Sequence, residues 1–223
     1  MCGRYTLSTP PSVLVEHFRL GSIPELTPRY NVAPTQQVGI VRRAEGDRRE
    51  FVWAQWGLVP RWAKDPKIGS SMINARAETA AEKPAYRDAF RKRRCLVAAD
   101  GFYEWKKTGA KTKQPYYMRL KNDQPFGIAG LWERCGELES CTILMTSPNE
   151  LCASVHDRMP VILSPADYDR WLDPALTDPG ELQPLLDAYP TDEMLATPVS
   201  THVNNVRNID ERCVAPMDQQ QLF

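Results

Sequence analysis

The sequence predicts an α+β fold: a single domain over residues 1–223, with a central, mainly antiparallel, barrel-like β-sheet and short flanking helices. Three observations support it. A chain of 223 residues with 42% hydrophobic residues is the size of one ordinary globular domain. Its 19 prolines keep the elements short. The apolar strand-like segments outnumber the helical ones and are too short and mixed for a doubly wound sheet.

The elements of the first half follow from turn residues and apolar patterns. Pro10-Pro11 after Thr9 starts an amphipathic helix that extends to about Leu20. Two strands, 37–41 and 51–56, are expected to be joined by a turn at Glu45-Gly46-Asp47. They are followed by a helix over 79–92, which Pro84 interrupts, and by a buried apolar strand over 95–99.

The second half is predicted to contain more strands than helices. Ser164 precedes Pro165 and is the expected N-cap of a helix that runs through Leu172. No internal repeat or linker is present. The remaining elements are expected as strands 116–120, 126–131, 142–145 and 161–163, one or two helical turns within 148–155, and a helix over 182–188.

The net charge is zero, but the charges are unevenly distributed. Residues 1–120 hold 22 Lys and Arg against 11 Asp and Glu, and residues 121–223 hold 6 against 17. Such asymmetry is typical of a protein whose basic half meets an anionic partner. The alternative is that the two halves interleave in the fold and neutralise each other.

The cysteine pattern and the termini predict a cytoplasmic protein. The six cysteines include no C-x-x-C pair, which argues against structural zinc, and a cytosolic location argues against disulfides. No stretch approaches the roughly 20 apolar residues of a membrane span, and the N-terminus lacks the order of a signal peptide. We expect a monomer with no metal and no organic cofactor.

Four segments that look like loops carry reactive side chains. Each also has a purely structural interpretation, because Asp-Gly is a turn signal, His156-Asp157 can cap a helix, and Glu104 can sit on the surface of an alternating strand. The four segments are Cys2-Gly3-Arg4, residues 74–78, residues 100–105 and residues 156–160.

Cys2 directly follows Met1, so removal of Met1 would create a 1,2-aminothiol. Its amine can condense with an aldehyde and its thiol can close a five-membered ring on the same carbon. The α-amine, with a pKa near 8, can also serve as a base for the thiol. Glu104 lies between Tyr103 and Trp105, where desolvation would raise its pKa toward neutrality for acid–base work. His156 adjoins Asp157 and is a candidate proton shuttle.

Taken together, the chain resembles the SRAP family, the SOS-response-associated proteins that crosslink to abasic sites. The resemblance spans nearly the whole chain and rests on six motifs in order. They are Met1-Cys2-Gly3-Arg4, Trp56-Gly57-Leu58-Val59-Pro60, Asn74-Ala75-Arg76-Ala77-Glu78-Thr79, Ala99-Asp100-Gly101-Phe102-Tyr103-Glu104-Trp105, His156-Asp157-Arg158-Met159-Pro160 and Val203-Asn204-Asn205-Val206-Arg207-Asn208.

The resemblance implies binding of single-stranded DNA at an abasic site and a covalent thiazolidine link through Cys2. It also implies autoproteolytic, peptidase-like removal of Met1 and lyase character, and a protein associated with the nucleoid when bound to DNA. By the same resemblance Glu104 is the acid–base group, His156 assists ring opening and imine formation, and Asn74 positions Cys2 or the sugar.

Recognition of a site that lacks a base must rest on backbone contacts and stacking. Arg4, Arg76 and Arg158 are candidates for phosphate contacts, because arginine binds phosphate oxygens in a bidentate way. Trp62 and Trp105 are candidates for stacking or wedging, with core packing as the alternative for each. Many relatives carry a second aromatic after the residue that matches Trp62. Here that position is Ala63, which predicts a weaker preference for junctions with duplex DNA.

Two other functions remain open. An N-terminal-cysteine glutamine amidotransferase also uses the thiol as nucleophile and the α-amine as base, but it needs neither Glu104 nor His156. A non-catalytic module for single-stranded nucleic acid would use the basic half and bind reversibly, in a salt-sensitive way.

Overall fold

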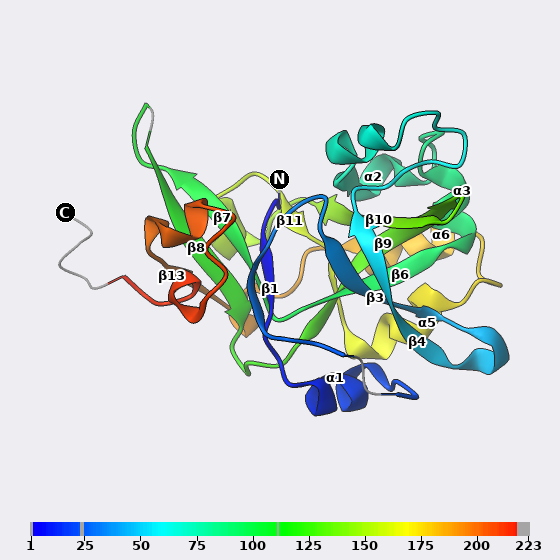
Figure 1. Ribbon diagram of the computed structural model, residues 1–223, viewed down its shortest axis with the longest axis horizontal. Coiled ribbons are helices and arrows are strands. Elements are labelled where there is room, and N and C mark those ends of the chain that lie inside the picture. Colours follow the sequence, from blue (N-terminus) through cyan, green and yellow to red (C-terminus); the bar gives the residue numbers. More distant parts are fainter. Residues whose placement is uncertain (1, 23–24, 111, 218–223) are drawn as a thin grey trace.

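A closed five-stranded barrel forms the centre of the molecule. The computed structural model describes residues 2–22, 25–110 and 112–217. The strands are joined in the order β10-β4-β3-β6-β9, and β9 pairs again with β10, which closes the ring (Figure 1). All pairs in this ring are antiparallel except β10 with β4. The barrel strands are β3 (Gln37–Arg43), β4 (Arg49–Trp56), β6 (Arg94–Ala99), β9 (Phe126–Cys135) and β10 (Leu138–Thr146).

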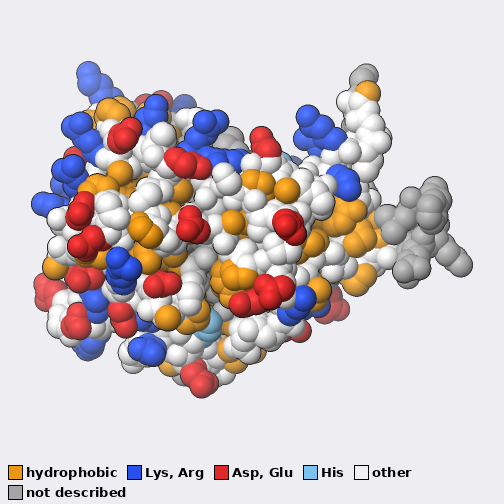
Figure 2. All heavy atoms as spheres, turned by 180° about the vertical axis from the view of Figure 1, so that it is seen from behind, with side chains coloured by type: hydrophobic (Ala, Val, Ile, Leu, Met, Phe, Trp, Pro, Cys, Tyr) orange, Lys and Arg blue, Asp and Glu red, His pale blue; other side chains and the backbone are white. Residues whose placement is uncertain are grey.

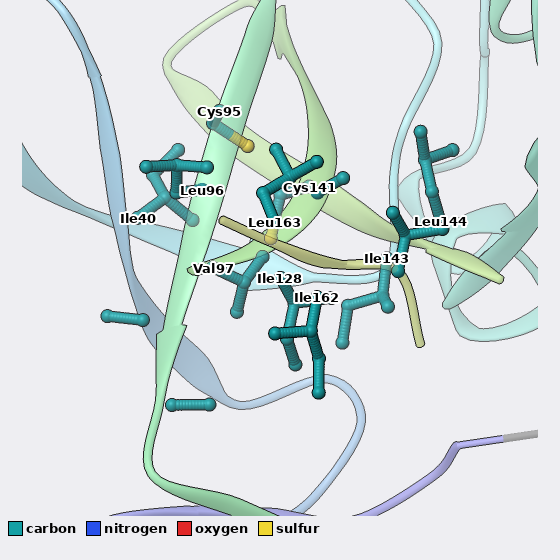
Figure 3. Packing of buried hydrophobic residues seen from close by; sticks show 14 of the residues in the cluster. Ile40, Cys95, Leu96, Val97, Ile128, Cys141, Ile143, Leu144, Ile162 and Leu163 are labelled. Carbon is teal, nitrogen blue, oxygen red and sulfur yellow. The ribbon is translucent and has the colours of Figure 1, made fainter. Parts of the chain in front are cut away.

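The barrel interior is filled by aliphatic and sulfur-containing side chains. Every residue of β6 is buried, and Val97 lies beside Ile40 of β3 and Ile128 of β9, its two neighbouring strands, in the core that also contains Ile143 (Figure 3). β-Branched residues suit such a surface because they fit the pleat and lose little rotamer freedom. Three short strands extend the barrel sheet: β5 (Asn74–Arg76), β11 (Met159–Pro160) and β12 (Ile162–Leu163).

A second, antiparallel sheet packs against the barrel. Its order is β13-β8-β7-β1-β2, and its strands are β1 (Tyr5–Leu7), β2 (Arg29–Val32), β7 (Gly101–Lys107), β8 (Lys113–Leu120) and β13 (Met194–Pro198). Side chains alternate between the faces of a strand. Phe102 therefore joins the barrel core, whereas Tyr103 packs on the other face against the C-terminal segment, with Val199 and Val203. Figure 1 shows that segment beside β7 and β8.

The helices are short and lie around the barrel. Among the described residues, no helix is long and apolar enough to cross a membrane. The α-helices are α1 (Pro11–Phe18), α2 (Ala77–Ala80), α3 (Arg87–Lys92), α4 (Glu150–Ala153), α5 (Tyr168–Leu172) and α6 (Pro179–Leu182). The 3₁₀ turns are η1 (Glu45–Asp47), η2 (Pro66–Ser71), η3 (Pro165–Asp167), η4 (Gln183–Leu186), η5 (Thr191–Glu193), η6 (Thr201–Asn204) and η7 (Glu211–Cys213).

Asp100 fixes the segment that leads into α1. The N-cap position of this helix is Pro10, which provides no side-chain cap. The Asp100 carboxylate accepts hydrogen bonds from the backbone N–H groups of Ser8 (2.5 Å) and Thr9 (2.7 Å) and from both hydroxyls. The Asp-Gly pair thus ties β7 to the segment that leads into α1.

The α+β class and the mainly antiparallel, barrel-like sheet agree with the sequence prediction. Two segments predicted as loops are wrong: residues 74–78 form β5 and the start of α2, and residues 100–105 lie largely in β7. The predicted helix 79–92 is two helices, α2 and α3, because Pro84 cannot continue the first. The helix predicted after Ser164 begins as η3, and Ser164 caps that turn. The helix predicted over 182–188 is α6 followed by η4.

The acidic and basic halves interleave, as the alternative interpretation of the charge asymmetry predicts. Arg42 pairs with Glu139 at 3.1 Å, Arg49 with Asp169 at 2.7 Å, and Arg93 with Glu133 at 2.7 Å. Figure 2 shows acidic and basic side chains mixed over the back of the molecule. Several arginines of the basic half are therefore neutralised within the fold, and the charge of this half alone does not define an anionic partner.

Candidate functional site

Cys2 lies at the junction of the two sheets. It is completely buried, and its Sγ donates a weak hydrogen bond to the Arg4 carbonyl at 3.6 Å. Burial, and then the nearby charge of Glu104, raise the pKa of the Cys2 thiol well above its usual value. The thiol is therefore held protonated. Met1, whose removal the sequence analysis requires, lies outside the described residues.

Glu104 reaches this junction because of its register on β7. The β1–β7 pairing sets Tyr5 opposite Phe102, and the Tyr103 N–H donates to the Arg4 carbonyl at 3.0 Å. Glu104 shares the face of Phe102, toward the barrel, and is 3% exposed. Burial, and then the charge of Asp157, raise its pKa to about 7. A carboxyl group with that pKa exchanges protons readily at neutral pH.

Asn74 is placed by the apolar motif that precedes it. The Trp56 indole N–H donates to the Ile73 carbonyl at 2.9 Å, and the Leu58 N–H donates to the Met72 carbonyl at 3.1 Å. These bonds brace the start of β5. Asn74 Nδ2 then donates to the Cys2 carbonyl at 2.8 Å. Its Oδ1 is buried and has no hydrogen-bond partner among the described residues.

His156 lies in the turn between α4 and β11, with its side chain 26% exposed. Its Nδ1 accepts a hydrogen bond from the Arg158 N–H at 3.1 Å and also lies 2.9 Å from an Asp157 carboxylate oxygen. Burial lowers the pKa of the imidazole. The neutral form of the ring is therefore favoured at neutral pH.

Arg158 and Arg76 lie on the same side as Asn74. Arg158 makes a bidentate ion pair with Glu78, at 2.6 and 2.7 Å. Arg76 is exposed at the end of β5, two residues from Asn74 and on its face of the strand. Of the two guanidinium groups, that of Arg76 is open to solvent and that of Arg158 is engaged by a carboxylate.

Arg4 and Trp105 belong to a separate depression, of about 410 Å³, which Lys113 and Asn204 complete. Trp105 follows Glu104 and so points to the opposite face of the sheet. Its indole N–H donates to Asn204 Oδ1 at 2.7 Å, and the Arg4 guanidinium carbon lies 6.0 Å from the ring centroid. Arg4 also donates to Asn31 Oδ1 and to the Val203 carbonyl, each at 3.0 Å.

Trp62 stands apart from both groups. It lies in a turn closed by the hydrogen bond from the Ala63 N–H to the Pro60 carbonyl (2.9 Å), and it is 63% exposed. Arg61 anchors the turn through an ion pair with Glu133 at 2.9 Å. A large aromatic on an anchored turn can present a flat apolar surface to a partner.

The structure thus brings together Cys2, Asn74, Glu104 and His156, with Arg76 and Arg158 nearby. Arg4 and Trp105 share the neighbouring depression, and Trp62 is on its own turn. Sequence analysis assigned no role to Lys113, Asn204 or Glu78. Glu78 lies in the motif 74–79 and Asn204 in the motif 203–208, so membership of these motifs was the signal that could have identified both residues. Lys113 belongs to the basic run after Trp105, which gave only a charge signal.

The described residues include no group of three or more His, Cys, Asp or Glu side chains arranged to hold a metal ion. The side chains at the junction supply a carboxyl group whose pKa is raised to about 7, an imidazole, an amide and a thiol.

Comparison with known proteins agrees with these motifs. The model of the family "SOS response associated peptidase (SRAP)" matches residues 1–206. The chain is 45% identical over 216 residues to abasic site processing protein YoqW of Bacillus subtilis, covering 93% of this chain and 96% of that protein. It is 31% identical to abasic site processing protein YedK of Escherichia coli, covering 97% and 100%, and 31% identical to HMCES of Gallus gallus, covering 86% and 67%.

A solved structure shares the fold. A protein from Bacteroides thetaiotaomicron superimposes with a TM-score of 0.86 at 27% identity, and the match covers 97% of this chain and 100% of that one. The two-sheet arrangement with a closed barrel is therefore found in an experimental structure of similar size.

Proposed function

Because this chain belongs to the SRAP family, and its relatives are named abasic site processing proteins, we propose that it crosslinks to abasic sites in single-stranded DNA. The observation that carries the proposal is the cluster of Cys2, Asn74, Glu104 and His156 at one junction. We propose that these four are the catalytic residues, that the protein acts as a monomer in the cytoplasm, and that the damaged strand is its partner.

The reaction begins with the sugar. An abasic deoxyribose is mostly a closed hemiacetal, so a proton must reach the ring oxygen as another leaves the hydroxyl on C1′. Glu104, with its pKa raised to about 7, is present in both forms at neutral pH and can donate or accept that proton. Neutral His156, with its pKa lowered by burial, can take up the second proton.

Bond formation then proceeds in two steps. The α-amine of Cys2 attacks the aldehyde carbon C1′, and loss of water gives an imine. The sulfur then adds to the imine carbon as its proton moves to the imine nitrogen, which closes the thiazolidine. The raised pKa of the Cys2 thiol supports this order, because a thiol kept protonated leaves the amine as the first nucleophile.

Asn74 holds the nucleophile in place. Its Nδ2 fixes the Cys2 carbonyl at 2.8 Å, which restricts rotation of the residue that carries both reacting groups. Its buried Oδ1, without a partner among the described residues, can accept a hydrogen bond from the α-amine or from a sugar hydroxyl. An acceptor left over in a buried position is costly, and a substrate donor would satisfy it.

We propose that DNA contacts come from both faces of the junction. Arg76 and Arg158 flank Asn74 and can bind phosphate oxygens, and Arg4 with Trp105 offers a cation and a stacking surface in the depression of about 410 Å³. Trp62, 63% exposed, would stack on a base or wedge beside a duplex.

The amine exists only after Met1 is removed. We propose that this removal is autoproteolytic, which accounts for the peptidase in the family description. An imine at C1′ also labilises the strand 3′ to the lesion, so lyase character would appear when ring closure fails.

A denaturing gel tests the proposal. Purified protein is incubated with an oligonucleotide that bears one abasic site, and intact mass is measured to establish that Met1 is gone. We expect a shifted band for wild type and none for Cys2→Ala. Cys2→Ala and Cys2→Ser both keep the α-amine but not the sulfur, so each should give a band only after its imine is trapped with borohydride. Cys135→Ala, which removes the one cysteine that is not buried, serves as the control and should crosslink fully.

The same gel separates the other candidate functions. A chain with one alanine inserted between Met1 and Cys2 keeps the thiol and displaces the amine. If it crosslinks like wild type, the thiazolidine is wrong. A wild-type protein that hydrolyses glutamine and gives no band would be an amidotransferase. Salt-sensitive binding without a band would indicate a non-catalytic module.

A further inference from the structure

A second cationic site lies far from Cys2, at the end of the molecule formed by α1, the β3–β4 hairpin and α5. It is a cavity of about 550 Å³, hereafter the arginine pocket, lined by Arg19, Leu20, Gly21, Arg43, Asp47, Arg48, Arg49 and Asp169. In Figure 1 these elements lie at the bottom and lower right, whereas β7, which carries Glu104, lies at the upper left. The pocket is thus separate from the junction.

Arg49 is the fixed part of the arginine pocket. Its side chain is only 5% exposed, Nη1 donates to the Phe18 carbonyl at 3.0 Å, and Nη2 donates to Asp169 at 2.7 Å. The Phe18 carbonyl is at the last residue of α1, where a cation also offsets the helix dipole. A guanidinium held on both sides in this way keeps its orientation when a ligand arrives.

The positive charge of the pocket is only half compensated. Asp169 is shared by three guanidinium groups, at 2.7 Å from Arg49, 3.8 Å from Arg19 and 4.0 Å from Arg43. Asp47, whose side chain is 87% exposed, pairs with Arg43 alone. Four arginines therefore face two carboxylates.

Arg43 adds an unused donor. Its Nε is buried and has no hydrogen-bond partner among the described residues, although the side chain is 16% exposed. A buried donor without an acceptor is unfavourable, and an oxygen-rich anion in the pocket would remove that cost.

We propose that the arginine pocket binds a phosphate group. Guanidinium forks suit phosphate oxygens, which accept paired hydrogen bonds, and the excess of two positive charges matches a phosphate dianion or two phosphodiesters. Arg19 and Arg48, both exposed, supply the mobile contacts, and Arg43 and Arg49 supply the fixed ones. The phosphate belongs either to a small molecule or to the backbone of a strand that extends beyond the junction.

Two probes distinguish these sources: inorganic pyrophosphate, and an undamaged single-stranded oligonucleotide, each titrated by calorimetry. The test variant is Arg19→Ser with Arg48→Ser. The matched control is Arg87→Ser with Arg91→Ser, which removes the same charge from exposed positions on α3. Loss of both exposed arginines should weaken binding to the phosphate source at least tenfold, and the control should change it by less than about twofold.

Each outcome decides the proposal. Loss of pyrophosphate binding alone supports a site for a small phosphate. Weaker oligonucleotide binding alone, with a salt slope smaller by about 1 to 2, supports a backbone contact. Unchanged binding of both probes in the test variant, or an equal loss in the control, overturns the phosphate site. Melting temperatures equal to wild type establish that both variants fold.

Discussion

The carboxyl group of Glu104 is buried on β7, and its pKa is raised to about 7, above the value of about 4.3 expected in the unfolded chain. Between these two values the folded protein binds more protons than the unfolded chain, so stability is lost as the pH rises. The shift corresponds to roughly 3–4 kcal/mol above pH 7. Burial of Glu104, the residue proposed for proton transfer, therefore lowers the free energy of unfolding at neutral pH and above.

Glu104→Gln should therefore stabilise the protein and impair its chemistry. Thermal unfolding at pH 8 should shift upward by several degrees, and the gain should shrink toward pH 5, where Glu104 is protonated in the native state. Crosslink formation should slow by about 10²-fold, typical for loss of an acid–base group, and reversible DNA binding should stay near wild type. An equal crosslinking rate in the variant would remove Glu104 from the mechanism.

The ion pair between Arg158 and Glu78 is expected to limit how tightly Arg158 binds DNA. Glu78 has a 45% exposed side chain, so the pair contributes at most about 1 kcal/mol, and a DNA phosphate can compete for the guanidinium. Glu78→Gln removes a negative charge near the strand and releases Arg158. Binding of an undamaged oligonucleotide, measured by fluorescence anisotropy at low salt, should tighten about threefold.

Arg158→Gln is the matched control for that measurement and should weaken binding. The double variant should resemble Arg158→Gln alone, since Glu78 acts through the arginine. If Glu78→Gln binds less tightly than wild type, the pair positions Arg158 for DNA instead of withholding it.

At the scale of elements, the sequence predicted buried strands better than the short elements around the site. The apolar run 95–99 was recognisable because β6 is buried on both faces. β5 was predicted as a loop, because Asn74 and Arg76 are polar and only Ala75 points inward. β7 is obscured by the Asp-Gly turn signal and by a carboxylate that faces the core. Both segments become strands because they pair with strands distant in the sequence, and local propensity carries no information on such pairing.

The turn that carries Trp62 gives the prediction for this scale. The turn is anchored by the ion pair of Arg61 with Glu133 at 2.9 Å. It presents one exposed aromatic side chain, Trp62, because the next residue is Ala63. A single wedge should part a duplex less effectively than two adjacent aromatics. Crosslink yields on single-stranded and junction substrates should be similar for wild type, and Ala63→Trp should shift them toward the junction. Equal junction preference in the two proteins would contradict the idea.

At the scale of the whole molecule, the sequence showed where charge is concentrated but not what neutralises it. The run Arg91-Lys92-Arg93-Arg94 lies in the basic half, whose excess of charge indicated an anionic partner. In the fold, Arg93 pairs with Glu133, 40 residues away in the chain, and Arg94 is buried and donates to backbone carbonyls of α3 and α5. Contacts between distant segments are set by topology, which composition does not encode. In the arginine pocket, by contrast, four arginines lie beside two aspartates, and this excess of positive charge is the basis of the phosphate proposal.

Arg94 joins α3 to α5 through its hydrogen bonds. Its replacement should therefore lower the free energy of unfolding more than replacement of any other residue in the run. Its guanidinium donates to the carbonyls of Phe90 at 2.7 Å, Arg91 at 2.6 Å and Trp171 at 2.5 Å, and also to those of Asp173 and Leu176. Arg94→Met leaves these carbonyls without a donor, so we expect a loss of about 3–5 kcal/mol in unfolding free energy.

Chemical denaturation measures this loss directly, and Arg91→Met supplies the comparison. Arg91 is exposed in the same run, so its substitution should change stability by about 0.5 kcal/mol or less. Arg94→Lys keeps one charge but reaches fewer carbonyls, and it should fall between the two. If Arg94→Met and Arg91→Met unfold at the same denaturant concentration, the buried arginine does not join α3 to α5. Within the run, the ion pair of Arg93 with Glu133 would then be the contact that ties it to the rest of the fold.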